Sequence, residues 1–120
     1  MNIEVRVRGP VDVVDVSVGA APNGSDTTLH DKLAKLLDAG ESLFILNMIE
    51  GPTLDSELVG ELVASRERVR KHQGIIKLVL TPKQYSLVVA SRLDSLFETF
   101  QDEDDALDSF APWYTTAGIP

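Results

Sequence analysis

The stretch LFILNMIEGPTLDSE, residues 43–57, joins an apolar run to a short loop and a helix start. Residues 43–48 are nearly all apolar, which is typical of a buried strand. Further on, apolar residues recur at helical spacing, so we expect a helix over about residues 55–72. Asp55 falls at the natural N-cap of this helix, and Ser56 then lies in its first turn.

Ser56 has two interpretations from its position alone. A helix N-terminus has unsatisfied amide groups and the positive end of the dipole, so a phosphate added to Ser56 would be stabilised there. The serine could then be a phosphorylation switch. It could equally be a plain capping residue.

The composition indicates one globular domain. The chain has 120 residues, of which 43% are hydrophobic and 25% charged, as in an ordinary globular protein. We expect the domain at residues 1–110 and a C-terminal tail at 111–120, whose Trp113 and Tyr114 are candidates to pack against the domain. The chain has no cysteine, which excludes disulfides and cysteine metal sites.

Charge and hydropathy exclude several kinds of partner. The net charge of −8 argues against nucleic acid, whose binding depends on cationic contacts to phosphate, and it disfavours anionic membrane surfaces. The N-terminus lacks the apolar core of a signal peptide, and no apolar stretch approaches the roughly 20 residues needed to span a bilayer. We therefore expect a cytoplasmic protein with no nucleic-acid or membrane partner.

Strands alternate with helices on both sides of the opening stretch. Residues 3–8 alternate apolar and charged side chains, and Gly9-Pro10 joins them to a more apolar strand, so this pair is expected to run antiparallel. The later alternation implies right-handed crossovers and a largely parallel sheet. The fold class is thus α/β: a single domain with a mixed, mostly parallel β-sheet, covered on at least one face by helices. The other expected elements are a helix capped by Asp26 or Thr27 and ending near Gly40, a strand at 75–80, a helix at about 83–94, a short strand within 96–100 and a helix at 102–110.

Two of these helices have apolar stripes that predict their buried faces. The stripes are Leu29, Leu33, Leu36 and Leu37 in the first helix, and Tyr85, Val88, Val89 and Arg92 in the helix at 83–94.

The first loop lacks the sequence of a P-loop, so we do not expect a nucleotide site there. Gly19 and Gly24 have the glycine spacing of a P-loop, which requires Lys and then Ser or Thr at the next two positions. Ser25 and Asp26 occupy those positions. Without the lysine, and with a carboxylate instead, nucleotide phosphates would be held poorly.

No catalytic or metal-binding constellation emerges from the remaining polar residues. No spacing joins His30 or His72 to Ser56, so both histidines are interpreted as exposed helix residues. The acidic run at 102–105 lacks the glycine and spaced ligands of a calcium loop. We interpret it as the start of the helix at 102–110, where acidic residues interact favourably with the helix dipole. The basic residues at 66–72 complement the dipole at the end of the central helix. We therefore expect no enzyme activity, no metal and no cofactor.

From about residue 43 to 110, the chain resembles the STAS domain of bacterial anti-sigma factor antagonists. In that family an apolar strand leads through a short loop to Asp-Ser-Ser-Gly-Leu-Gly, which opens the central helix; residues 55–60 here are Asp-Ser-Glu-Leu-Val-Gly. A basic helix end and Gly74 then precede a strand, as in the family. Residues 93–97 and the acidic helix at 102–107 are similar to the family's later segments.

The resemblance implies a STAS-like fold and a role in bacterial transcription regulation. In the family, the serine after the Asp is phosphorylated by a partner that is both a serine kinase and an anti-sigma factor. The unphosphorylated domain binds this partner and frees the sigma factor, and the phosphorylated domain releases it. The resemblance therefore implies phosphorylation of Ser56 and a serine-kinase anti-sigma factor as partner. The partner-binding residues that it implies are Asp55, Ser56, Glu57, Val59 and Gly60.

The chain departs from the family pattern beside the serine. Glu57 replaces the second serine and Leu58 the first glycine, while the loop at 50–53 lacks the usual apolar residues. A second hypothesis is therefore a non-phosphorylated STAS scaffold, or a subunit of a stress-signalling complex or a transporter. No oligomeric state is predicted.

Overall fold

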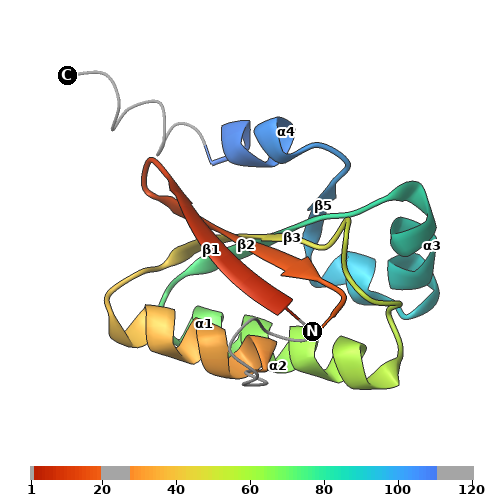
Figure 1. Cartoon of the computed structure of the whole chain (residues 1–120), viewed down its shortest axis with the longest axis horizontal. Coiled ribbons are helices and arrows are strands. Elements are labelled where there is room, and N and C mark those ends of the chain that lie inside the picture. Colours follow the sequence, from red (N-terminus) through yellow and green to blue (C-terminus); the bar gives the residue numbers. More distant parts are fainter. Residues whose placement is uncertain (1, 20–27, 111–120) are drawn as a thin grey trace.

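Five strands form one sheet whose spatial order, β1-β2-β3-β4-β5, follows the chain (Figure 1). The computed structural model describes residues 2–19 and 28–110. β1 and β2 pair antiparallel and the other neighbours pair parallel, which confirms the predicted α/β fold. The strands are β1 (Asn2–Arg8), β2 (Val11–Ser17), β3 (Leu43–Asn47), β4 (Ile75–Val79) and β5 (Glu98–Phe100). The helices are α1 (Leu29–Asp38), α2 (Ser56–Lys71), α3 (Pro82–Ala90) and α4 (Glu103–Asp108), with a short 3₁₀ turn, η1 (Leu93–Ser95), after α3.

The N-terminal hairpin forms as predicted. Its turn is at Gly9-Pro10, where Gly9 has a φ of 61° that a glycine adopts without strain. Ile3 and Val5 pack against the core, in line with the alternating pattern. Val7 is 73% exposed, because it lies near the turn at the end of the strand.

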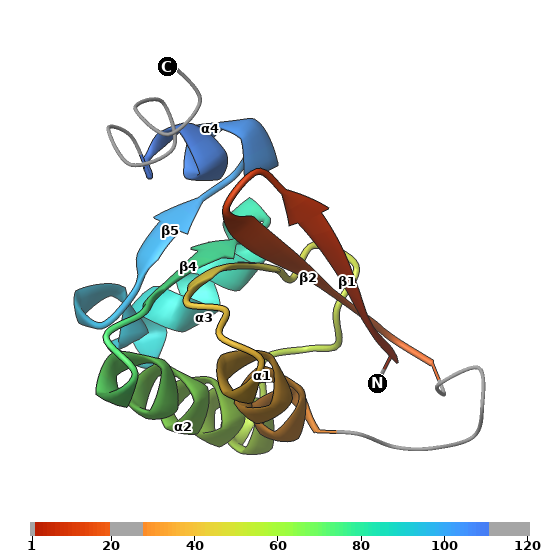
Figure 2. The ribbon, with the colours of Figure 1, turned by 90° about the vertical axis from the view of Figure 1, so that its left-hand side faces the viewer.

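The helices form two layers, one on each face of the sheet (Figure 2). α1 and α2 lie side by side on one face and α4 lies on the opposite face. α3 contributes Val88 to the same core as α1 and α2. The three helices predicted near 27–39, 55–72 and 83–94 therefore cover one face together. Within the described residues, no helix is both long and apolar enough to cross a membrane.

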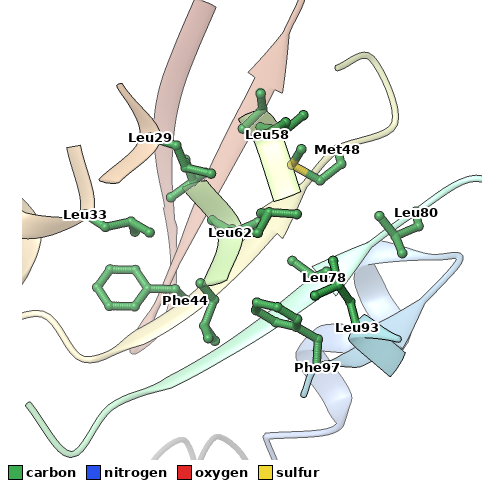
Figure 3. Packing of buried hydrophobic residues seen from close by; sticks show 14 of the residues in the cluster. Leu29, Leu33, Phe44, Met48, Leu58, Leu62, Leu78, Leu80, Leu93 and Phe97 are labelled. Carbon is green, nitrogen blue, oxygen red and sulfur yellow. The ribbon is translucent and has the colours of Figure 1, made fainter. Parts of the chain in front are cut away.

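The larger core, named here the α1/α2 core, lies between the sheet and helices α1, α2 and α3 (Figure 3). Phe44 and Leu46 of β3 point into it and are fully buried, since alternate residues of a strand share one face. Leu62, at the middle of α2, packs against them with no exposed surface. This packing holds α2, and with it the loop at 48–54, against the ends of the strands.

The smaller core, named here the α4 core, lies on the opposite face of the sheet. Ile45, between Phe44 and Leu46 in β3, points to this side and is fully buried. α4 covers this face, although it has only six residues. The buried residues of the α4 core are Val11, Val13, Leu43, Ile45, Val79, Ala106, Leu107 and Phe110.

The cap of α1 differs from the prediction. Thr28 is the N-cap, and its side chain accepts a hydrogen bond from the Asp31 amide at 3.1 Å. Asp26 and Thr27 lie outside the described residues, as do Trp113 and Tyr114 in the predicted tail. The leucines follow immediately after Thr28, so any of three consecutive capping residues was compatible with the pattern.

The stripe predicted for α3 is confirmed only at Val88, and the predicted length of the helix is wrong. Tyr85 and Val89 are 42% and 44% exposed, whereas Gln84 and Val88 are buried. Gln84 thus takes the buried position expected for Tyr85; it also forms a capping box with Thr81, which fixes the start of the helix. α3 ends at Ala90 because Arg92 adopts a left-handed conformation, with a φ of 60°.

Candidate functional site

The candidate site is the start of α2, where the chain leaves the sheet. Asp55 is the N-cap, and its Oδ1 accepts a hydrogen bond from the Leu58 amide at 2.9 Å. Ser56 is the first residue of the helix and is exposed to solvent. The amides of the first helical residues have no intrahelical acceptor, so the backbone N–H groups here carry the partial positive charge of the helix dipole.

A tight turn carries the chain from β3 into this site. The Gly51 amide donates to the Met48 carbonyl at 2.8 Å, and the Val18 amide donates to the Glu50 carbonyl at 3.1 Å. A Cβ on Gly51 would lie 3.0 Å from the Met48 oxygen and 3.3 Å from the Val16 oxygen, so any side chain here would crowd these two carbonyls. Leu54 is buried in the α1/α2 core and anchors the other end of the loop.

An open groove of about 400 Å³ lies beside the first turns of α2. Thr28 at the start of α1 lines one side, and Pro52 of the loop lies near Asp55. Gly60 also lines the groove, and a Cβ there would meet no atom within 4 Å. The two helix starts therefore border a groove that is open among the described residues.

The groove is acidic. Asp55, Glu57 and Glu61 line it, and none of them forms an ion pair with another residue that the structure describes. Glu61 accepts a hydrogen bond from the His30 amide at 3.3 Å, so this carboxylate lies at the start of α1.

The residues that depart from the family pattern have separate roles. Leu58 is 5% exposed and packs in the α1/α2 core, so it serves the fold. Glu57 is exposed next to Ser56. Val59 is partly buried and Gly60 is exposed. Of the predicted partner-binding residues, Asp55, Ser56, Glu57 and Gly60 thus present surface at the start of α2.

Basic residues of α2 form contacts with other elements, in addition to their favourable interaction with the helix dipole. Arg66 Nε donates to the Leu96 carbonyl at 2.7 Å, which ties α2 to the segment before β5. Arg68 Nε donates to His30 Nε2 at 3.1 Å and links α2 to α1. His72, in contrast, is exposed, and its ring Nδ1 lies 3.0 Å from the Arg68 carbonyl oxygen of the same helix.

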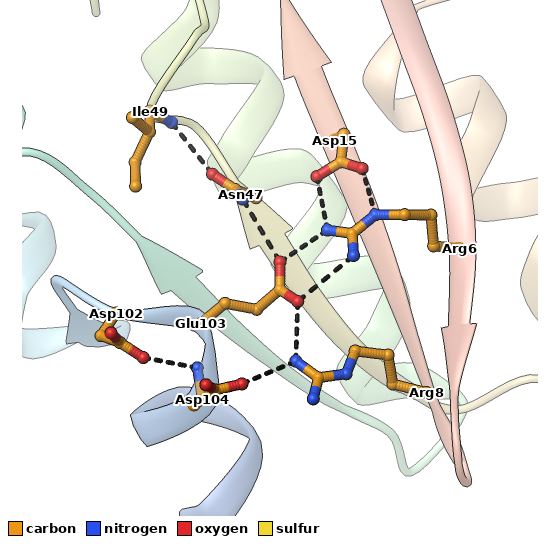
Figure 4. A network of polar contacts seen from close by, with 8 residues as sticks. All are labelled: Arg6, Arg8, Asp15, Asn47, Ile49, Asp102, Glu103 and Asp104. Atoms are coloured by element: carbon orange, nitrogen blue, oxygen red, sulfur yellow. Dashed lines mark hydrogen bonds and ion pairs between the residues drawn. The ribbon is translucent and has the colours of Figure 1, made fainter.

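A polar network on the far face of the sheet was not anticipated from the sequence (Figure 4). Glu103 of α4 accepts hydrogen bonds from Arg6 and Arg8 of β1, and from Asn47 at 3.4 Å. The Arg6 hydrogen bond is the main cause of a lowered pKa for Glu103. The acidic run at 102–105 therefore contacts the β1–β2 hairpin, and its first residue, Asp102, caps α4. The opposite charge of Arg6 and Arg8 is visible in the sequence, but it does not by itself identify their partner.

Within the described residues, no three or more His, Asp or Glu side chains gather to hold a metal ion.

Solved structures with this arrangement of strands and helices come from anti-sigma factor antagonists. An anti-sigma factor antagonist from Mycobacterium paratuberculosis superposes with a TM-score of 0.72 at 22% identity, over 89% of this chain and 91% of that one. A proposed anti-sigma factor antagonist from Thermotoga maritima gives a TM-score of 0.68 at 14% identity, over 89% and 92% of the chains. No protein-family model and no curated protein matches this chain. The chain therefore has the STAS-like fold of anti-sigma factor antagonists.

Proposed function

We propose that this chain is a regulatory protein-binding module that acts as an anti-sigma factor antagonist in the cytoplasm. The observation that carries the proposal is Ser56, exposed at the first position of α2 on a fold shared with such antagonists. Its partner is a serine-kinase anti-sigma factor, which binds the surface formed by Asp55, Ser56, Glu57, Val59 and Gly60.

Phosphorylation of Ser56 is the proposed switch. A phosphate adds a charge of about −1.5 to −2 and a firmly held hydration shell to the contact surface. Asp55, Glu57 and Glu61 already make this corner negative. The added charge therefore raises the cost of desolvating the surface against the partner, and the complex dissociates.

Affinity measurements with four forms of the chain test this proposal. Ser56→Ala should keep the fold and bind the kinase constitutively, while Ser56→Asp should bind more weakly than wild type, and the phosphorylated chain more weakly still. Ser95→Asp, which places the same charge at an exposed position in η1, is the matched control and should bind like wild type. Equal affinities of wild type, Ser56→Ala, Ser56→Asp and the phosphorylated chain would reject the switch.

The alternative is a structural subunit that is never phosphorylated, in a signalling complex or with a transporter. Among the described residues, Asp55, Glu57 and Glu61 form no ion pair, so no cation paired with them is in place to stabilise a phosphate, and this favours the alternative. Isolation from the host with intact-mass measurement separates the two functions. A mass increase of one phosphate that Ser56→Ala abolishes supports the switch, and an unmodified chain in a stable complex supports the subunit.

A further inference from the structure

Gln84 connects α3 to the turn that leads into the Ser56 site. It is the third residue of α3 and only 8% exposed. Its Oε1 accepts a hydrogen bond from the Thr81 amide at 3.0 Å, which completes the capping box of α3. Its Nε2 donates to the Met48 carbonyl at 2.6 Å, across 36 residues of chain.

The second hydrogen bond is not needed to cap the helix. A capping box requires only an acceptor at this position, and glutamate fills that role as well as glutamine. A buried amide is costly unless it is fully hydrogen-bonded, so a residue chosen for packing alone would be apolar. The Nε2 donor therefore points to a role at Met48.

The Met48 carbonyl is the point at which the chain turns away from the sheet. It also accepts the Gly51 amide at 2.8 Å, and the Met48 amide donates to the Val79 carbonyl of β4 at 3.0 Å. The turn is thus fixed on one side by the sheet and on the other by α3. Gln84 also lines a groove of about 180 Å³ between α3 and this loop, together with Thr53 and Leu54.

We propose that Gln84 is a positioning residue for the Ser56 site: its amide holds the Met48 carbonyl, and the seating of α3 thereby sets the loop that the partner meets. This inference rests on the proposed function and deepens it. It extends the functional unit from the start of α2 to the start of α3, which local sequence around Ser56 does not indicate.

Two variants separate the contact with Met48 from the cap of α3. Gln84→Glu keeps an acceptor for the Thr81 amide but removes the donor to Met48. Thr81→Ala removes the cap hydrogen bond that the Gln84 backbone N–H donates to Thr81 Oγ1 at 3.1 Å, and leaves the Met48 contact in place. Gln84→Met, which is similar in size and lacks both contacts, serves as a second variant should the buried carboxylate prevent folding.

Hydrogen exchange of the Gly51 amide is the first measurement. In Gln84→Glu or Gln84→Met this amide should exchange about tenfold faster than in wild type, which corresponds to the loss of one buried hydrogen bond. In Thr81→Ala it should exchange at the wild-type rate, although the melting temperature falls. The inference would be overturned if the Gly51 amide exchanged at the wild-type rate in both Gln84 variants. It would also be overturned if Thr81→Ala, at the same loss of stability, accelerated this exchange as much as the Gln84 variants do.

Affinity for the serine-kinase anti-sigma factor is the second measurement. The Gln84 variants should bind about tenfold more weakly, and Thr81→Ala should bind as wild type does. Faster exchange with unchanged affinity would show that the contact orders the loop without serving the partner, and would refute positioning. If wild type itself binds no such kinase, the proposed function fails, and the exchange data still decide whether Gln84 sets the loop.

Discussion

Asp55 stabilises α2 from the surface of the protein. Its carboxylate satisfies the Leu58 amide and lies at the positive end of the helix dipole. Both effects act on the element that presents Ser56, so the residue that starts the helix also places the site. Its neighbour Leu54, in contrast, is held by burial alone.

Replacing Asp55 should therefore weaken the fold measurably. We expect Asp55→Ala to lower the free energy of unfolding by about 1 kcal/mol, through loss of the cap hydrogen bond and the dipole interaction. Asp55→Asn keeps an acceptor and should lose only a fraction of that. Urea denaturation of both variants measures the difference, and equal losses would argue that the cap oxygen is not what matters.

Asp12 of β2 should destabilise the protein at neutral pH. It is 2% exposed, and its Oδ2 has no hydrogen-bond partner among the described residues. Burial, followed by the neighbouring Glu41 carboxyl, raises the pKa of Asp12 to about 6. The folded chain then binds more protons than the unfolded chain between about pH 4 and pH 6, so stability falls as the pH rises through this range.

Asp12→Asn removes this penalty. We expect the variant to gain about 1 to 3 kcal/mol relative to wild type on moving from pH 4 to pH 7.5, because only the wild type must ionise a buried group. Thermal unfolding at both pH values measures the gain. Asp94→Asn, at an exposed carboxylate, is the control; a pH-independent difference for Asp12→Asn would contradict the explanation.

At the scale of elements, Gly60 within α2 and Gly74 between α2 and β4 differ in the space that surrounds them. Gly60 lies on the open side of the helix, whereas a Cβ on Gly74 would lie 2.4 Å from the Ser42 carbonyl oxygen. Gly60→Ala should stabilise the chain by about 0.5 to 1 kcal/mol through helix propensity. Gly74→Ala should destabilise it by about 2 kcal/mol, because the backbone of the loop before β3 must move. Chemical denaturation of this pair checks both signs.

The attachment of α4 depends on ionised Glu103. Its side chain is 19% exposed and bonds two arginines of β1, so Glu103→Gln should cost about 1 kcal/mol at pH 7. Since its pKa is lowered in the fold, this contribution is complete above the ordinary carboxyl pKa and is lost as the pH falls through the lowered value. Urea melts at pH 7 and pH 3 measure it. Glu67→Gln, at a 53% exposed ion pair within α2, should change stability by less than about 0.5 kcal/mol.

Features that depend on neighbouring residues could be predicted from the sequence, whereas contacts between distant segments could not. The strand at 43–47 and the cap at Asp55 follow from neighbouring residues, so periodicity and capping rules predict them. The contact of the Gln84 side chain with Met48 and the pairing of Glu103 with Arg6 depend on chain segments far apart in sequence. Their partners become visible only when the sheet brings these segments together, and charge or polarity alone does not identify them.

At the scale of the whole molecule, the sheet separates two cores of unequal size. Among residues 2–19 and 28–110, eighteen buried hydrophobic residues belong to the α1/α2 core and eight to the α4 core. Ser56, Gln84 and the loop between β3 and α2 all adjoin the larger core. The proposed partner surface therefore belongs to the more stable part of the fold, while α4 is held by a small core and by partly exposed ion pairs.

This asymmetry predicts that α4 opens independently. In native-state hydrogen exchange, the amides of α4 should exchange through an opening that costs less free energy than that of α2 and has a weaker dependence on denaturant. Leu107→Ala should lower the opening free energy of α4 by about 2 kcal/mol and leave that of α2 nearly unchanged. Leu62→Ala, within the larger core, should lower both, because α4 has no sheet to pack on once that core is lost. Identical opening free energies and denaturant slopes for the two helices would instead describe one cooperative unit, in which a change at α4 reaches Ser56 through global stability.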